Sequence, residues 1–396
     1  MNDRRSTRYD TLDVWRGLAC GAVIVFHAVV AGVAKPDFLA RMAAEGGSLA
    51  DWLVIAGARL WVGVPVFFVI SGYCIAAAAE SARGRPHPCR SFFTRRFRRI
   101  YPPLWVFLGI TAVAVTVLPF PMPFHPPGDF SAWQWAGSLT LTEEWRPHVV
   151  GPPRDYFVGH IWTLCYEEQF YLVLGLILAV APGRLFPAVA VVTAVVALKV
   201  IGVLPFPFPT YGFFFDGLWL AFAAGVGVYY RVNLANASAR LCLDLGFLIG
   251  TIWAVAHIPD RWEFSQTVPA NLAVAFPTAA VLGWLHRFDS RTARLRMLAP
   301  IRWCGVRCYS LYLVHGPIAS TLSLNLHIAG ATSSAATVFV TVPLCLAASA
   351  LAAWGFHRWV ETRFLNAPAT AQAALPVAKS GASATVTSRV RCPVES

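Results

Sequence analysis

The sequence GVPVFFVISGYCIAAAA, residues 63–79, contains no charged residue and decides the fold class. It belongs to a predominantly apolar segment, 56–79, which exceeds the about 20 residues that a helix needs to cross a bilayer. The arginine-rich stretch SFFTRRFRRIYPPLW, residues 91–105, follows it and leads into another apolar run. Apolar runs joined by basic connections are typical of a protein that crosses a membrane several times.

Nine further segments have the composition of spanning helices. The chain of 396 residues is 57% hydrophobic and only 13% charged, whereas roughly a quarter of the residues of a soluble domain are charged. We predict an all-α, polytopic integral membrane protein with about ten transmembrane helices. Their predicted ranges are 12–34, 56–79, 101–119, 161–181, 185–204, 213–230, 243–258, 268–286, 305–328 and 335–357.

The arginines predict how the helices are oriented. They gather in the connections 83–99 and 287–302, and three more precede the first helix. With ten helices all of these lie on one side, and the positive-inside rule makes that side cytoplasmic. Both termini are then cytoplasmic. The expected parts are a cytoplasmic segment 1–11, a membrane domain 12–365 and a disordered cytoplasmic tail 366–396.

The formal net charge of +12 has the same origin. Because the basic residues stand between apolar runs, they indicate membrane topology and no nucleic-acid partner. The nine cysteines fall mostly in or beside apolar runs, and no two Cys pairs have the spacing of a zinc site. We therefore expect no metal and no permanently bound cofactor.

Ionisable side chains inside spanning helices are costly and are candidates for function. The first predicted helix contains Asp13, Arg16 and His27. Arg16 and His27 are eleven residues apart, which is three turns plus about 20°, so they share a face and lie roughly 16 Å apart along the axis. Arg16 is then at the cytoplasmic mouth, and His27 is in the outer half of the membrane.

The fourth predicted helix begins IWTLCYEEQFYLVL, residues 161–174, and runs inward. Glu167 lies roughly 9 Å below the outer face and His27 roughly 22 Å above the inner face. In a hydrocarbon core about 30 Å thick the two reach a similar depth. They could form a catalytic base and its orienting partner, or a satisfied polar pair between helices.

Two other segments could hold a slender, phosphorylated ligand. Ser71 and Gly72 form a notch of small residues that could admit a ligand or a neighbouring helix. Four arginines are predicted at the cytoplasmic N-terminus of the third helix, where they could bind phosphate or serve as a topology signal that contacts lipid headgroups. These arginines are Arg95, Arg96, Arg98 and Arg99.

The ninth predicted helix contains CGVRCYSLYLVHGPI, residues 304–318. Tyr312 and His315 are three residues apart and share a face near the middle of the membrane. His315 could be a second catalytic group or a histidine that makes a hydrogen bond in the core. A transporter or proton-relay protein could use the same ionisable residues, and a non-catalytic membrane scaffold is a third class of function.

Six segments in order resemble the acyltransferase-3 family of bacterial membrane proteins. They span about residues 9–364. They are YDTLDVWRGLACGAVIVFHAV, GVPVFFVISGYCIA, FFTRRFRRIYPPLW, IWTLCYEEQFYLVL, CGVRCYSLYLVHGPI and RWVETRF. The resemblance implies an enzyme of the bacterial cytoplasmic (inner) membrane. Such an enzyme moves an acyl group, usually acetyl, from cytoplasmic acyl-coenzyme A to a hydroxyl of a glycan, lipid-linked sugar or secondary metabolite.

The resemblance also assigns roles to residues. The family's Arg-x10-His pattern falls on Arg16 and His27, and its Trp-Ser-Leu-x-x-Glu pattern ends on Glu167, with threonine in place of serine. The expected catalytic residues are His27 and Glu167. The expected donor-binding residues are Arg16, Arg95, Arg96, Arg98, Arg99, Ser71 and Gly72, with Arg96 and Arg99 or Arg95 and Arg98 as the Arg-x-x-Arg pair. The possible accessory residues are Asp13, Tyr73, Trp162, Tyr312 and His315.

A reaction route follows from these roles. The coenzyme A phosphates would lie on the arginines, and the thioester arm would pass Ser71 and Gly72. His27 would take the proton of the acceptor hydroxyl, with Glu167 orienting the imidazole. A covalent acyl-histidine relay is the alternative.

Overall fold

The computed structural model describes residues 9–33, 47–151, 153–206, 210–258 and 267–365. Within these ranges the chain is helical and contains no β-strand, which confirms the all-α prediction. The predicted tail 366–396 and most of the segment 1–11 lie outside the described residues. The helices are α1 Leu12–Ala31, α3 Leu49–Ala58, α4 Gly63–Arg83, α5 Pro88–Val117, α6 Ala132–Thr140, α7 Trp162–Val180, α8 Leu185–Val200, α9 Trp219–Asn233, α10 Ala237–Ala256, α11 Val268–Leu285, α12 Asp289–Thr292, α13 Ala299–Val306, α14 Cys308–Ile328, α15 Ser334–Ala336 and α16 Val342–Trp359.

Eight helical stretches in the described ranges are long and apolar enough to cross a membrane, so the protein is a multi-pass membrane protein. The two remaining predicted spans correspond to α9 and α14. α9 has only 15 residues, and α14 has polar side chains such as His315, Asn325 and His327. Both helices are largely buried against other helices, and an enclosed helix needs no apolar face toward lipid. The count of ten stays a prediction.

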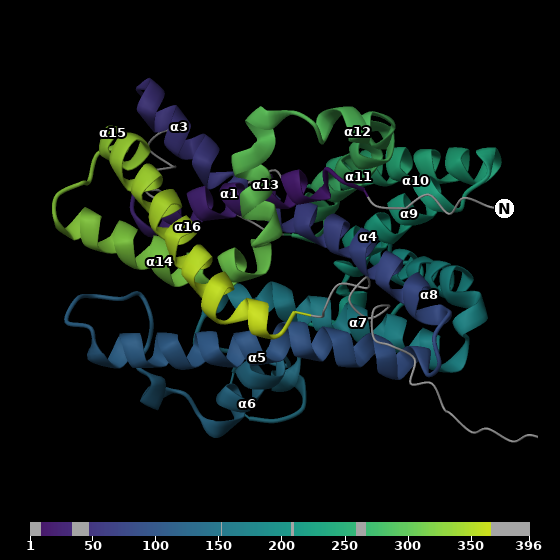
Figure 1. Ribbon diagram of the computed structural model, residues 1–396, viewed down its shortest axis with the longest axis horizontal. Coiled ribbons are helices and arrows are strands. Elements are labelled where there is room, and N and C mark those ends of the chain that lie inside the picture. The colour runs from purple at the N-terminus through teal and green to yellow at the C-terminus, as the bar shows by residue number, and fades with distance from the viewer. Residues whose placement is uncertain (1–8, 34–46, 152, 207–209, 259–266, 366–396) are drawn as a thin grey trace, which may run out of the picture.

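Helix α4 lies at the centre of the bundle and packs against α1, α5, α7, α9 and α11 (Figure 1). Its crossing with α9 is very close. A methyl group added at Gly72 would collide with the carbonyl of Phe222, and one added at Gly225 would collide with the carbonyl of Val69. Glycines that face the opposite backbone let two membrane helices approach. This crossing fixes the rotation of α4 about its axis.

Helix α5 is longer than predicted. It begins at Pro88 instead of near residue 101, and it continues through Pro102 and Pro103. Arginine side chains have long aliphatic stems, which lets a helix extend past the hydrocarbon with its charges in water. The prediction that the four arginines stand at a helix N-terminus was therefore wrong, because they lie two to three turns inside α5.

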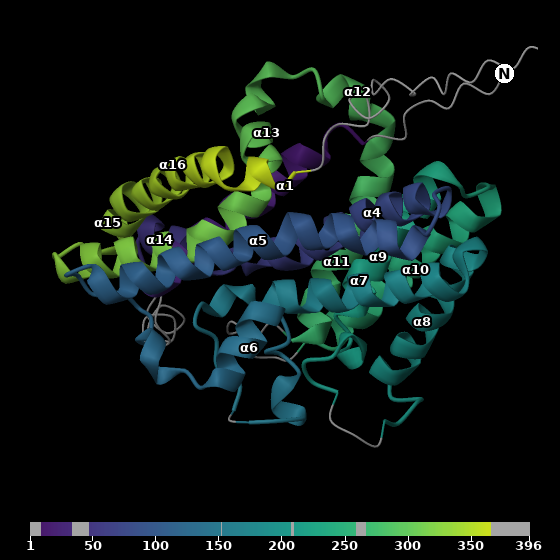
Figure 2. The same ribbon diagram turned by 60° about the horizontal axis from the view of Figure 1, so that its bottom comes forward.

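The connections form two opposite faces of the bundle. In both views, α6 and the 118–158 connection lie on one side, and α12 and α13 lie on the other (Figure 1, Figure 2). Which face is cytoplasmic stays a prediction.

Buried charges hold the 118–158 connection in a folded shape. Arg146 donates two hydrogen bonds, of 2.7 and 2.8 Å, to the carboxylate of Glu143, and both side chains are almost fully buried. These bonds raise the pKa of the Arg146 guanidinium above its usual value. Arg154 donates a 2.5 Å hydrogen bond to Glu144, and Tyr156 donates one to a cysteine of α7. The connection is thereby fixed against the start of α7.

Candidate active site

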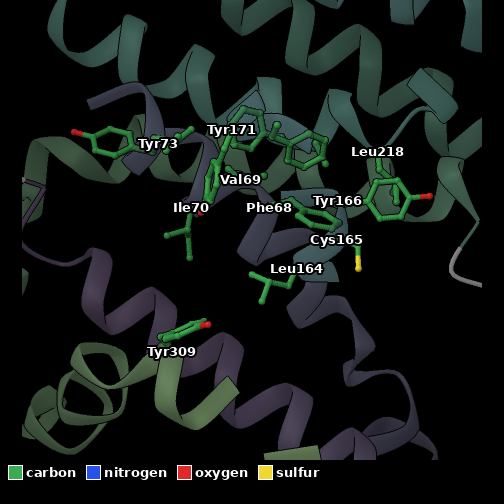
Figure 3. Close-up of a cluster of buried hydrophobic side chains, with 14 of the residues drawn as sticks. Phe68, Val69, Ile70, Tyr73, Leu164, Cys165, Tyr166, Tyr171, Leu218 and Tyr309 are labelled. Carbon is green, nitrogen blue, oxygen red and sulfur yellow. The ribbon is translucent and has the colours of Figure 1, made fainter. Parts of the chain in front are cut away.

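A cavity of about 450 Å³ lies between α1, α4, α5, α7 and α14. It brings together residues that are up to about 300 positions apart in the chain. The predicted site residues that line it are Arg16, His27, Ser71, Arg96, Arg99, Trp162, Glu167, Tyr312 and His315. Its apolar wall includes Ile70 and Leu164, which face Tyr309 of α14 in Figure 3.

The arginine side chains come to the cavity from two helices. Arg16 of α1 donates a 2.6 Å hydrogen bond to Asp13 and a 2.7 Å hydrogen bond to the sulfur of Cys74. Arg96 of α5 lies with its guanidinium carbon 5.3 Å from the centre of the Tyr171 ring. Together with Arg99 they line the same cavity. This concentration of positive charge suits an anionic, phosphorylated group.

The structure distinguishes between the two possible Arg-x-x-Arg pairs. Arg96 and Arg99 line the cavity, whereas Arg95 and Arg98 do not. Arg98 is exposed on the outer surface of α5. Neighbouring residues on a helix point about 100° apart, so residues three apart share a face and their immediate neighbours do not.

The carboxylate of Glu167 is held by two hydroxyl groups. Ser71 of α4 and Tyr171 of α7 both donate hydrogen bonds to its Oε1 atom. The adjacent Glu168 is turned toward α5, where it accepts a 3.3 Å hydrogen bond from Tyr101. Of the two adjacent glutamates, only Glu167 lines the cavity.

Ser71 and Gly72, the two small residues of the predicted notch on α4, have different roles. Ser71 faces the cavity, while Gly72 faces the backbone of α9 at the helix crossing. Tyr73 also points away from the cavity, and its buried ring makes edge contacts with Tyr9 and Tyr229. Gly72 and Tyr73 thus contribute to packing. Ser71 is the one residue of the three that a ligand in the cavity could touch.

His27 is surrounded by rings. Its imidazole centre lies 5.3 Å from that of His315 and 6.4 Å from that of His160. Among the described residues, the His27 ring has no hydrogen bond with Glu167, although both side chains line the cavity. The predicted orienting contact between these two residues is therefore not formed in this structure. Two histidine rings therefore lie beside His27.

His315 is fixed by its own helix. Its Nδ1 atom lies 3.1 Å from the Leu311 carbonyl oxygen and 2.6 Å from the Tyr312 carbonyl oxygen. Carbonyl oxygens only accept hydrogen bonds, so Nδ1 carries the proton and Nε2 carries the lone pair. Within the described chain this buried Nε2 atom has no hydrogen-bond partner.

Tyr312 ties α14 to the start of α7. Its hydroxyl donates a 2.9 Å hydrogen bond to the carbonyl of His160 and lies 3.0 Å from the hydroxyl of Thr163. Thr163 is the residue that stands in place of the family's usual serine. Because it keeps a hydroxyl, it can make this contact, so the substitution preserves the link.

His160 is a cavity residue that the sequence did not single out. It lies in the helical turn just before α7, and its ring centre is 4.8 Å from that of His315. Its ring fills the space left by Gly316, where an added methyl group would collide with it. The neighbouring Pro317 has no N–H to bond the Leu313 carbonyl. The Gly316–Pro317 pair was the sequence signal that could have indicated a side chain such as His160 packed against α14 at this point.

The arrangement can bind an anion at one part of the cavity and do imidazole chemistry at another. Imidazoles act as general bases or nucleophiles in group transfer. In the described ranges no group of His, Cys, Asp or Glu has a geometry that could hold a metal ion. Three imidazoles at the wall of one cavity suit proton or acyl transfer.

Comparison with known proteins identifies relatives that are named as O-acetyltransferases. A family model described as an acyltransferase domain matches residues 9–357. The peptidoglycan O-acetyltransferase OatA of Listeria monocytogenes is 24% identical over 361 residues, which cover 80% of this chain and 51% of the relative. The O-acetyltransferase OatA of Staphylococcus aureus is 24% identical over 293 residues, which cover 65% and 46%. The putative peptidoglycan O-acetyltransferase YrhL of Bacillus subtilis is 24% identical over 286 residues, which cover 65% and 44%.

The chain spans about half the length of these curated relatives. No solved structure matches it. The family match includes the arginines, the glutamate and the three histidines that line the cavity.

Proposed function

The chain belongs to the acyltransferase-3 family, and from this premise we propose that it is an O-acetyltransferase that transfers an acetyl group from acyl-coenzyme A to a glycan hydroxyl. The observation that carries the proposal is the single cavity lined by Arg16, Arg96, Arg99 and His27. It joins an anion-binding region to a reactive imidazole.

The donor fits the shape and charge of the cavity. Acyl-coenzyme A has a phosphorylated head and a long, thin arm that ends in the thioester. The head would lie on Arg16, Arg96 and Arg99, and the arm would extend past Ser71 toward His27. The separation of Arg16 and His27 by three turns of α1, roughly 16 Å, supports this placement because the two groups must contact opposite ends of one extended molecule.

The reaction centres on His27. In direct transfer, a nitrogen of His27 takes the proton of the acceptor hydroxyl while the oxygen attacks the thioester carbonyl. The carbon–sulfur bond breaks, and the coenzyme A thiolate leaves and takes a proton from the imidazolium. In the relay alternative, His27 first carries the acyl group and then passes it to the hydroxyl. Glu167, held by Ser71 and Tyr171, supplies negative charge that would stabilise the imidazolium through the cavity.

The acceptor proposal rests on the relatives. Two of them are named as peptidoglycan O-acetyltransferases, one as putative, which supports a glycan of the cell envelope over a lipid-linked sugar or a secondary metabolite. We further propose ten membrane crossings in a bacterial cytoplasmic membrane with both termini cytoplasmic, because this topology puts the basic connections on the side of the donor. Because the chain belongs to an acyltransferase family, we propose neither a transporter nor a non-catalytic scaffold.

The acceptor class can be tested in cells. Bacteria that express the protein should gain alkali-labile acetyl esters in the purified glycan fraction of the envelope, compared with cells that express the His27→Ala variant. Extra esters in the lipid or small-molecule fraction alone would contradict the glycan proposal. Equal ester content in all fractions of both strains would contradict the proposed activity.

A further inference from the structure

The geometry of His315 leaves its Nε2 atom available to accept a hydrogen bond. Its Nδ1–H is committed to the backbone carbonyls of Leu311 and Tyr312, so its Nε2 can only accept. That atom is buried and has no partner in the described parts of the chain. A buried acceptor without a partner is destabilising, so such an atom in a functional cavity calls for a reason.

Two imidazoles lie close enough to supply a donor, His160 and His27, and His27 is the one that the proposed reaction uses. The ring centres of His27 and His315 are 5.3 Å apart, with the planes inclined at 57°. The His27 ring, for its part, makes no hydrogen bond within the described residues. The carboxylate of Glu167, which the sequence suggested as the orienting group, is already bonded to Ser71 and Tyr171. A neutral imidazole has one N–H donor and one acceptor nitrogen, so His27 can satisfy His315 with the first and react with the second.

We propose that His315 is the positioning residue of His27: its Nε2 accepts a hydrogen bond from the N–H of His27 and so holds the tautomer whose other nitrogen faces the reactants. This inference rests on the proposed function. It gives His315 the role that a carboxylate has beside the histidine of a Ser-His-Asp triad, with a neutral acceptor in place of a charged one.

The proton balance of direct transfer is unchanged by this role. The hydroxyl proton goes to the free nitrogen of His27, the new oxygen–carbon bond forms and the carbon–sulfur bond breaks. The imidazolium then returns that proton to the thiolate. His315 takes up no proton at any step. It keeps the second N–H of the imidazolium hydrogen-bonded, which stabilises the charged form inside the membrane.

The fixed backbone around His315 supports this assignment. Pro317 and Gly316 interrupt the regular packing of α14 directly after it, and the His160 ring fills the space beside Gly316 at 4.8 Å from the His315 ring. His315 is thus held from its own helix on one side and by a neighbouring ring on another. A positioning group must itself be held in place.

Three variants in the full-length protein test the inference. His315→Gln keeps an amide oxygen near the place of Nε2, whereas His315→Asn is too short to reach it. Asn325→Ala is the structural control, because it removes a 2.8 Å hydrogen bond from the same helix, α14, to the carbonyl of Pro121, ten residues beyond His315 and outside the cavity. Acetyl transfer from labelled acetyl-coenzyme A to glycan strands from the expression host gives kcat and KM.

We expect His315→Asn to lower kcat about 10- to 100-fold, the usual loss when a supporting hydrogen bond is removed, with KM for acetyl-coenzyme A unchanged. His315→Gln should restore at least a third of the parent kcat, and Asn325→Ala should leave kcat as in the parent. Equal losses in the Asn and Gln variants, parent-like kcat in the Asn variant, or a loss confined to KM would each overturn the inference.

A second readout separates this inference from the proposed function. Diethyl pyrocarbonate modifies the free nitrogen of a histidine, and peptide mass spectrometry follows the rate at His27 without any acyl transfer. We expect the His27 rate to fall at least threefold in His315→Asn and to stay unchanged in Asn325→Ala. An unchanged rate in His315→Asn would overturn the positioning role, whereas absent glycan acetylation by the parent with this reactivity pattern intact would count against the proposed function alone.

Discussion

Ser71 on α4 donates a hydrogen bond to the carboxylate of Glu167 on α7, and this bond joins two helices at the wall of the cavity. Tyr171 donates to the same oxygen. A carboxylate inside a membrane is stable only if it is paired or hydrogen-bonded. The two hydroxyls therefore hold the Glu167 carboxylate in a defined position beside the proposed donor route.

Removal of these hydroxyls should reduce activity stepwise. We expect Ser71→Ala and Tyr171→Phe each to lower kcat/KM about 3- to 10-fold, because each hydrogen bond contributes about 1 kcal/mol. The double variant should lose more than the sum of the two free-energy changes, since it leaves the carboxylate without a hydroxyl partner. Thr116→Ala, which removes a hydroxyl bonded only within α5, serves as the control. Simple additivity, or an equal loss in the control, would contradict this account of Glu167.

Substitutions can distinguish the proposed donor-binding arginines from the neighbouring arginines of α5. Arg96→Ala and Arg99→Ala should each weaken acetyl-coenzyme A binding about 10- to 100-fold, because each removes a charged hydrogen-bond donor to phosphate. Arg98→Ala is the matched control, since Arg98 lies on the same helix but is exposed and outside the cavity. Binding is measured by isothermal titration in detergent. Equal weakening in Arg98→Ala would mean that general positive charge, and not the cavity, binds the donor.

The α4–α9 crossing predicts a stability difference between glycines. Gly72→Ala and Gly225→Ala each force a methyl group into an opposing backbone carbonyl, and overpacking of this kind costs about 1–3 kcal/mol. Gly109 of α5 has no atom within 4 Å of the added methyl group, so Gly109→Ala should be neutral or slightly stabilising. Thermal unfolding in detergent should show Tm values that fall only for the first two variants. A similar Tm for all three variants would contradict the close backbone contact between α4 and α9.

The buried ion pair of the 118–158 connection should matter more than an exposed one. Glu143→Gln leaves Arg146 buried without its charge partner, which costs about 3–5 kcal/mol. Glu80→Gln removes a partner of Arg83 in a pair whose side chains are about one-third exposed, and such pairs contribute only about 0–1 kcal/mol. Limited proteolysis should cut the connection faster in Glu143→Gln than in Glu80→Gln. Equal cleavage rates would contradict a folded connection.

The helices that face lipid could be predicted from the sequence because lipid imposes one simple requirement, an apolar run of sufficient length. The predicted range 12–34 corresponds to α1, Leu12–Ala31, and 161–181 corresponds to the stretch Gly159–Val180. The enclosed helices α9 and α14 meet that requirement poorly. Their neighbours are protein, so polar and small residues replace apolar ones.

The rotation of each helix could be predicted only in part. The 100° step placed Arg16 and His27 on one face, and both line the cavity. The same rule could not choose between Arg96 with Arg99 and Arg95 with Arg98, since that choice depends on where α5 packs. His160 escaped notice because it precedes a helix and reaches the cavity only through the space at Gly316. Contacts between distant segments decide such placements.

The most direct test of the central claim follows label from radiolabelled acetyl-coenzyme A into the glycan fraction of membranes that contain the parent or the His27→Ala variant. Both proteins should bind acetyl-coenzyme A and unfold at similar temperatures, which shows that the variant is intact. We predict label in glycan with the parent and a loss of at least about 100-fold with the variant, as expected when a catalytic base or nucleophile is removed. Equal incorporation by the two proteins would contradict the account, because His27 would then have no part in the transfer.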